Sequence, residues 1–272
     1  MNLRAKGADL KIGSDLAYAN FLEGKMTDEK MSPEAALAEA VKEGYETKLS
    51  KQTVYTYIDK GVFLRVTNKT LPVKKNKGLY NKVVRIKRAP KGKSIEDRPD
   101  AINNRERFGD WEMDSVIGKK KRGKTILALT ERQTLEERLR LLPNKKSESV
   151  VDALDKMERD VGFERFREIF KSITVDNGVE FSDSDGIQRS CTRPGEKRTT
   201  LYFCHPYTSC ERGQNENQNR MIRRWYPKGM GFDEVTEEEI QALEDWINHY
   251  PRKKFGYKSS DEMSKLYFIG MT

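Results

Sequence analysis

The order of apolar runs between residues 105 and 268 restricts the fold of this chain more than any other feature. Three short strand-like runs come first, and an amphipathic helical stretch, two further strand-like runs and two helical stretches follow. In chain order they lie at 111–118, 125–131, 138–142, 147–161, 170–175, 200–203, 211–225 and 237–249. Strands that precede the first helix pair by short connections, whereas later strands alternate with helices. The pattern predicts an α/β core whose sheet begins with antiparallel strands.

One segment supplies the whole basic excess of the chain. The 272 residues carry a net charge of +9, but residues 60–98 alone hold 13 basic and 2 acidic side chains, so the remainder sums to −2. Such a segment repels itself unless an anion covers it, and double-stranded DNA is the partner we expect. The alternative is a solvated linker. The residues expected to meet phosphates here are Lys74, Lys75, Arg85, Lys87 and Arg88.

Composition excludes several classes of protein and of site. Charged residues make up 35% of the chain, mean hydropathy is −0.84, and no apolar run approaches the ~20 residues that span a bilayer. The first residues show no secretory h-region, so we expect a cytoplasmic, nucleoid-associated protein without membrane contact. Cys191, Cys204 and Cys210 form no C-x-x-C pair, which gives a structural zinc site little support. With two histidines in all, site chemistry must depend on carboxylates.

Two short helices are predicted near the N-terminus. Ser32 and Pro33 suit the start of a helix that stops at Gly44, and Ser50 begins a second helix that stops at Gly61. Two short helices with a brief connection and a basic exit are typical of a helix-turn-helix that binds DNA. Any small pair of packed helices would give the same pattern, so the sequence leaves both interpretations open.

The changes in composition divide the chain into three predicted parts. Residues 1–60 form a helical, helix-turn-helix-like DNA-binding region. Residues 61–104 form a basic linker or arm, in which Pro72 and Pro90 interrupt regular structure. Residues 105–268 form the α/β core.

Three carboxylates occupy positions that fit a reactive site. Asp114 lies within the first predicted strand, where charge is uncommon. Asp176 ends a strand before Asn177-Gly178, and the carboxyl ends of strands in α/β sheets are ligand sites. Glu216 lies inside a helix. Each also has an ordinary explanation, namely an exposed sheet edge, a turn and a solvated helix face.

A helical wheel refines the position of Glu216. At 100° per residue, Asn219, Arg220 and Arg223 fall within roughly 60° of it. The opposite side carries the apolar residues Met221, Ile222 and Trp225. The helix is therefore expected to pack by its apolar side and to present Glu216 among cationic and amide side chains.

Three carboxylates without imidazoles suit the chemistry of phosphodiesters. Two divalent ions can activate a nucleophile and stabilise the leaving oxygen of an in-line displacement. Hard cations such as Mg²⁺ prefer carboxylate oxygens. The metal charge also relieves the repulsion between carboxylates that are drawn together.

Several long motifs then resemble one family. The segments GDWEMDSVIG, ITVDNGVEF and HPYTSCERGQNENQNRMIRRWYPKG are similar to the catalytic motifs of bacterial DDE transposases of the insertion-sequence-thirty family. NHYPRKKFGYKSSDEM resembles the C-terminal end of that family, and TVYTYIDKGVF resembles a helical DNA-binding segment. The similarity covers about residues 30–268.

The resemblance implies an integrase-type, ribonuclease H-like catalytic core, a mixed sheet flanked by helices. It assigns catalysis and metal binding to Asp114, Asp176 and Glu216, with two Mg²⁺ or Mn²⁺ ions. It further implies cleavage at the ends of a mobile element, strand transfer into target DNA by the freed 3′-hydroxyl, and a homodimer or larger synaptic assembly. Since this chain begins too late for the family's further N-terminal helix-turn-helix, the alternative is a truncated, catalytically silent DNA-binding remnant or regulator of intact copies.

Other residues receive expected roles around that triad. Those expected to surround the metal ligands are Glu112, Asn177, Glu180 and Asn219. Those expected to meet DNA phosphates are Arg220, Arg223, Arg224, Lys228, Arg252 and Lys253. Asp110 stands where the family has His, and its charge is expected close to the site, where it would weaken the approach of DNA. Trp111 and Trp246 are expected to pack in the core.

Overall fold

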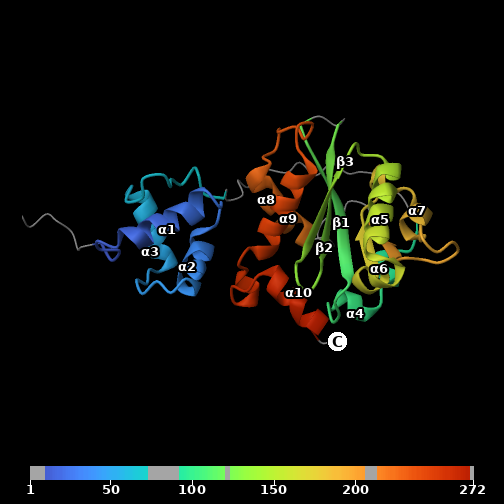
Figure 1. Cartoon of the computed structure of the whole chain (residues 1–272), viewed down its shortest axis with the longest axis horizontal. Coiled ribbons are helices and arrows are strands. Elements are labelled where there is room, and N and C mark those ends of the chain that lie inside the picture. Colours follow the sequence, from blue (N-terminus) through green and yellow to red (C-terminus); the bar gives the residue numbers. More distant parts are fainter. Residues whose placement is uncertain (1–9, 73–91, 120–122, 206–212, 270–272) are drawn as a thin grey trace, which may run out of the picture. The chain divides into compact units, whose positions relative to one another are not determined.

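The computed structural model divides the chain into two compact units (Figure 1). The structure describes residues 10–72, 92–119, 123–205 and 213–269. The first unit comprises Met1–Asn81 and Tyr250–Lys258, and the second comprises Lys82–His249 and Ser259–Thr272. Each unit is described by itself.

Three helices form the first unit. They are α1 (Leu16–Thr27), α2 (Pro33–Lys42) and α3 (Lys51–Asp59). Leu22, Ala36 and Val54, one from each helix, are fully buried at the centre of its core. Burial of one apolar face from each short helix stabilises helices that would be marginal alone.

The predicted starts of α2 and α3 are confirmed. The Ser32 hydroxyl accepts a hydrogen bond from the Ala35 N–H, and the Ser50 hydroxyl accepts one from the Thr53 N–H. Pro33 occupies the first helical position, where its missing N–H costs nothing. Each helix is followed by a glycine with positive φ, Gly44 and Gly61.

The chain returns to the first unit after α9 (Glu237–His249). The Tyr250 hydroxyl accepts a hydrogen bond from the Ser32 N–H at 3.1 Å and donates one to the Ser32 hydroxyl at 3.2 Å. Lys253 Nζ lies 2.7 Å from Glu34 Oε1. The segment Tyr250–Lys258 thus contacts the N-terminal end of α2.

A mixed sheet organises the second unit. The strands are β1 (Asp110–Ile117), β2 (Thr125–Glu131), β3 (Glu137–Leu142), β4 (Ser172–Val175) and β5 (Thr200–Phe203). Their order is β3-β2-β1-β4-β5, with β1, β2 and β3 antiparallel and with β4 and β5 parallel to β1. The predicted α/β class and the antiparallel beginning of the sheet are confirmed, and the arrangement agrees with a ribonuclease H-like core.

Helices cover both faces of this sheet (Figure 1). On one face lie α5 (Ser147–Val161), α6 (Phe163–Ile169) and α7 (Ser184–Gln188). On the other lie α8 (Gly213–Trp225) and α9. The remaining helical elements are η2 (Ile95–Asp97), α4 (Asp100–Asn103), η3 (Val179–Phe181) and α10 (Ser260–Ile269). Within the described part of the chain, no helix is long and apolar enough to cross a bilayer.

Some local predictions were incomplete. The helices α6, α7 and α10 were not predicted, because each is short or has a polar sequence and is stabilised by packing on its neighbours. At the start of α5, Lys146 occupies the capping position and its side chain makes no capping bond. The side-chain Oδ1 of Asn144 instead accepts from the Lys146 N–H and from the Ser149 hydroxyl.

The two faces of β1 differ in chemistry. Trp111 and Met113 are fully buried in the apolar core, which includes residues of α5 and α6 and confirms the core prediction for Trp111. Glu112 and Asp114 alternate with them and lie on the face that α8 covers. The apolar face anchors the strand, and the polar face supplies the side chains of the candidate site.

Candidate active site

Asp114 and Asp176 follow two residues that are paired in the sheet. In the parallel pair of β1 and β4, Glu112 lies opposite Thr174. Asp114 lies two residues after Glu112 within β1, and Asp176 lies two residues after Thr174, directly beyond the end of β4. Both residues are half-buried. Two predicted site residues that are 62 positions apart in sequence thus follow positions that lie opposite each other in the sheet.

Helix α8 reaches Asp114 through an amide. Asn219 Nδ2 donates a hydrogen bond to Asp114 Oδ2 at 2.8 Å. One turn later, Arg223 Nη2 donates to the Ile117 carbonyl oxygen at 2.7 Å, so this side of α8 runs along β1. Glu216 lies on α8 three residues before Asn219, and its side chain falls outside the described part of the structure.

The wheel prediction for α8 was partly wrong. Met221 and Ile222 are buried as expected, but Trp225 is 37% exposed. Asn215 and Gln218, which are polar, are buried instead. The helix packs on the polar face of β1, so amide side chains rather than a third apolar residue fill part of its contact surface.

A tight turn holds Asp176. The Gly178 N–H donates to Asp176 Oδ1 at 2.8 Å, and Asn177 Nδ2 donates to the Cys204 carbonyl oxygen at 2.8 Å. A Cβ atom on Gly178 would lie 2.8 Å from Asp176 Oδ1 and 2.5 Å from Glu180 Oε2. A side chain at position 178 would require these carboxylates to shift, so Asp176 and Glu180 flank the same point of the backbone.

Glu180 is buried with one oxygen engaged. Lys145 Nζ lies 3.0 Å from Glu180 Oε1, while Glu180 Oε2 and Asn177 Oδ1 are buried without a hydrogen-bond partner. Unsatisfied buried oxygens beside Asp176 are donors of the type that hard divalent cations prefer, so the residues fit a bound divalent cation. Lys145 was not predicted, because a lysine pair before a helix gives no signal in the sequence.

Glu112 has a different environment from its predicted one. It is buried and forms an ion pair with the buried guanidinium of Arg132. A buried pair of this kind is costly to break, because either charge would remain uncompensated. Glu112 therefore contacts a cation of the protein itself, two residues before Asp114 on the same strand face.

The expectation for Asp110 was wrong. Its carboxylate is buried, and Arg107 donates to both oxygens at 3.0 and 3.1 Å, while the Ser172 hydroxyl donates at 2.6 Å. Asp110 begins β1, four residues before Asp114, which corresponds to about 13 Å along a strand. Its charge is paired inside the protein at the start of the strand.

Comparison with known proteins finds similarity to transposases. The chain is 37% identical over 219 residues to the "Probable transposase for insertion-like sequence element IS1161" of Streptococcus salivarius, which covers 80% of this chain and 59% of that protein. The chain is a relative of insertion-sequence transposases. It is also 37% identical over 171 residues to the transposase for insertion sequence element IS4351 of Bacteroides fragilis, and 32% identical over 178 residues to the transposase InsI for element IS30C of Escherichia coli.

The matches cover only part of each transposase. The second and third cover 63% of this chain, and 49% and 42% of the respective relatives. This transposase relative therefore spans about half the length of the curated proteins it matches. No protein-family model matches the chain.

The predicted phosphate contacts of this transposase relative have unequal surroundings on α8 and beyond it. Arg220 and Lys228 are exposed. Arg223 is half-buried, and a second hydrogen bond joins it to the Tyr226 carbonyl oxygen at 3.3 Å. Burial lowers the pKa of the Arg223 guanidinium. Arg223 thus holds α8 on β1, whereas Arg220 and Lys228 face solvent.

Cations elsewhere are engaged or lie outside the described residues. The Arg224 guanidinium lies 5.8 Å from the ring centroid of Trp246, which is half-buried rather than fully in the core. Arg252 lies 6.0 Å from the Tyr250 ring, and Lys253 pairs with Glu34. The residues outside the described part are Lys74, Lys75, Arg85, Lys87 and Arg88.

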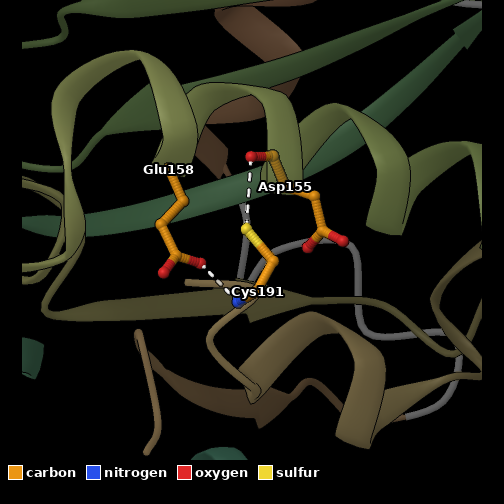
Figure 2. Close-up of side chains that lie close together, drawn as sticks. All are labelled: Asp155, Glu158 and Cys191. Carbon is orange, nitrogen blue, oxygen red and sulfur yellow. Dashed lines mark hydrogen bonds between the residues drawn. The ribbon is translucent and has the colours of Figure 1, made fainter. Parts of the chain in front are cut away.

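A second group of candidate metal ligands lies away from the carboxylates of β1 and β4. Figure 2 shows Asp155 and Glu158 on α5 beside Cys191, which follows α7. One ligand atom from each residue lies within 4.8 Å of the others. The Cys191 S–H donates to the Asp155 carbonyl oxygen at 3.4 Å (Figure 2). Burial raises the pKa of the Cys191 thiol, which disfavours the thiolate that metals bind.

The carboxylates of this group already have donors. The fully buried Arg198 guanidinium donates to Asp155 and, at 3.4 Å, to Glu158. Burial by itself would raise the pKa of the Glu158 carboxyl. Hydrogen bonds from Ser190, Thr192 and Cys191 outweigh burial and lower this pKa to about 2. The group is a hydrogen-bonded ion network that joins α5 to the segment after α7, and a metal ion would have to displace these donors.

Proposed function

We propose that this protein is the catalytic part of a DDE-type DNA transposase, which cuts the ends of a mobile element and joins them to target DNA. The observations that support the proposal are the pairing of Glu112 with Thr174, two residues before Asp114 and Asp176, and the hydrogen bond from Asn219 of α8 to Asp114. Glu216, on the same helix, is proposed as the third carboxylate. The similarity to named transposases supports the assignment.

Asp114, Asp176 and Glu216 are proposed to hold two divalent cations, Mg²⁺ or Mn²⁺. When bound, these ions activate the attacking oxygen and stabilise the leaving oxygen of an in-line displacement. The chain's own contribution is orientation. The Asn219 amide donates to one oxygen of Asp114, and the Gly178 N–H donates to one oxygen of Asp176, so each bond orients one of the proposed ligands.

Two displacements at phosphorus account for the reaction. In the first, water attacks a phosphodiester at the element end, the P–O3′ bond breaks, and a free 3′-hydroxyl remains. In the second, that 3′-hydroxyl attacks a phosphodiester of the target, so that a new P–O bond forms as another breaks. No covalent bond between protein and DNA is required.

The first unit and the basic segment are proposed to bind the DNA. Helices α2 and α3 have the capped, closely spaced arrangement of a helix-turn-helix. The basic side chains of residues 60–98, which carry a net charge of +11, would contact DNA phosphates without recognising the base sequence. Since both element ends must be held together, a homodimer or larger assembly on double-stranded DNA is proposed. The place of action is the bacterial nucleoid.

The test is metal-dependent cleavage. Purified protein is incubated with Mg²⁺ and a duplex that carries the terminal repeats flanking its gene. We expect nicking or joining that is lost in Asp114→Asn, Asp176→Asn and Glu216→Gln, while Asp185→Asn on α7 retains activity. Cleavage that persists in all three triad variants would refute the assignment.

A DNA-binding regulator without catalysis is the second candidate. It is favoured by the capped, closely spaced helices α2 and α3 of the first unit, which fit a helix-turn-helix and carry none of the three proposed catalytic carboxylates. The same duplex distinguishes the two. A regulator binds the terminal repeats with no cleavage at any Mg²⁺ or Mn²⁺ concentration, and the triad variants then bind as the wild type does.

A further inference from the structure

The carboxylates beside Asp176 include one with a dedicated cation. Glu180, on η3, is almost completely buried, and Lys145 Nζ lies 3.0 Å from its Oε1 atom. Lys145 comes from the connection between β3 and α5 and is 30% exposed. The ion pair therefore links the connection between β3 and α5 to η3, which follows the turn that carries Asp176.

The second oxygen of Glu180 is turned toward Asp176. Glu180 Oε2 and Asp176 Oδ1 flank Gly178, and Glu180 Oε2 is buried with no hydrogen-bond partner among the described residues. A buried carboxylate with one unsatisfied oxygen beside a second carboxylate is unfavourable without a cation. A divalent cation held by Asp176 would supply positive charge next to this oxygen of Glu180.

We propose that Lys145 is a positioning residue, which holds Glu180 so that its free oxygen supports divalent-cation binding at Asp176. The proposal rests on the proposed function and adds Lys145 and Glu180 to it. Lys145 acts through Glu180. Without Lys145, the Glu180 carboxylate would lose the contact that fixes its position and would turn away, so its negative charge would no longer lie beside the cation.

The sign of the change in cation affinity distinguishes the positioning role of Lys145 from a simple effect of its charge. Removing a positive charge near a cation site strengthens cation binding if nothing else changes. Removing a residue that keeps the Glu180 carboxylate in place weakens cation binding. Lys145→Ala is therefore expected to act in the same direction as Glu180→Gln, although the two substitutions change the net charge in opposite directions.

The experiment measures Mn²⁺ binding to the full chain without DNA, by electron paramagnetic resonance of the free ion. Asp114→Asn and Asp176→Asn identify the binding that belongs to the proposed site. We expect Lys145→Ala and Glu180→Gln each to weaken this binding by about 10–100-fold, as loss of supporting groups does in metal sites. The double variant should bind as weakly as either single variant, because both remove the same interaction. Lys145→Arg should restore most of the affinity.

A matched control variant tests whether the loss of Mn²⁺ affinity is specific to Lys145, and thermal unfolding tests whether each variant is folded. Lys156 pairs with Glu237 at 3.3 Å on the surface, and Lys156→Ala is expected to leave Mn²⁺ affinity unchanged. If Lys145→Ala binds Mn²⁺ as tightly as the wild type, or more tightly, the positioning role is overturned while the proposed function stands. If the wild type has no Mn²⁺ binding that Asp114→Asn removes, both the proposed metal site and the positioning role are overturned.

Discussion

Asn219 donates its side-chain amide to Asp114 across 105 positions of the chain. The bond joins the middle of α8 to the strand residue that the sequence identified as unusual. It fixes one Asp114 oxygen as an acceptor and sets the position of α8, and with it Glu216, along β1. Two contacts therefore hold α8 along β1, namely the hydrogen bond from Asn219 to Asp114 and the hydrogen bond from Arg223 to the Ile117 carbonyl oxygen.

Loss of that amide should reduce activity more than stability. In Asn219→Ala, Asp114 loses a charge-assisted hydrogen bond, and we expect metal-dependent cleavage to fall by about 10–100-fold. The midpoint of thermal unfolding should fall by only a few degrees, about the effect of 1–2 kcal/mol. Asn217→Ala, which makes the same change at an exposed position of α8, is the control. Equal cleavage rates for the two variants would show that Asn219 does not orient Asp114.

Glu158 should make the second unit sensitive to acid. Hydrogen bonds hold its folded-state pKa at about 2, below the ordinary value of 4.5. A lowered folded-state pKa contributes stability that is present above pH 4.5 and is lost as pH falls toward 2. Glu158→Gln should lower the free energy of unfolding at pH 7 by up to about 3 kcal/mol, and should lose less stability than the wild type between these limits.

Urea unfolding over a pH series measures the Glu158 effect. The control is Glu164→Gln, because Glu164 is exposed and its partner is the exposed Arg193. Its effect should stay below about 1 kcal/mol at every pH. An acid dependence of Glu158→Gln that matches the wild type would show that this carboxylate is not the one protected.

Asp110 should matter for stability and not for DNA binding. Asp110→Asn removes the charge that pairs with Arg107, and we expect the free energy of unfolding to fall by about 1–3 kcal/mol. Because the carboxylate is buried at the start of β1, DNA affinity should not change. Fluorescence anisotropy with a labelled duplex checks affinity, and urea unfolding checks stability. Tighter DNA binding by Asp110→Asn would mean that its charge does reach the DNA.

The basic segment, residues 60–98, should make the affinity for DNA depend strongly on salt concentration. With ~6–10 phosphate contacts, affinity should fall about 10³–10⁵-fold between 50 and 200 mM salt. Replacing Lys74 and Lys75 by Ala should reduce the slope of log K against log salt by about 1.8 if each contacts one phosphate. Anisotropy titrations at several salt concentrations measure both quantities. An unchanged slope in the double variant would identify this stretch as a solvated linker.

Much of the fold could be predicted from the sequence, because the patterns that indicate its strands and helices are local. Apolar periodicity located the strands and α5, and the capping serines located α2 and α3. The helices α6, α7 and α10 were missed, since their stability comes from packing on distant residues. The position of Asp110 was misjudged for a related reason. A single aspartate next to a motif says nothing about Arg107 and Ser172, which neutralise it.

By itself the sequence determined the α/β class, the basic segment and the three carboxylates, because residue types, periodicity and order are properties of neighbouring residues. Only the tertiary structure decided which oxygens come together. The parallel pairing of β1 and β4 sets Glu112 opposite Thr174, two residues before Asp114 and Asp176, and the Lys145–Glu180 ion pair lies just after the turn that carries Asp176. Those relationships arise from strand pairing and burial between segments far apart in the chain, and no local pattern encodes them.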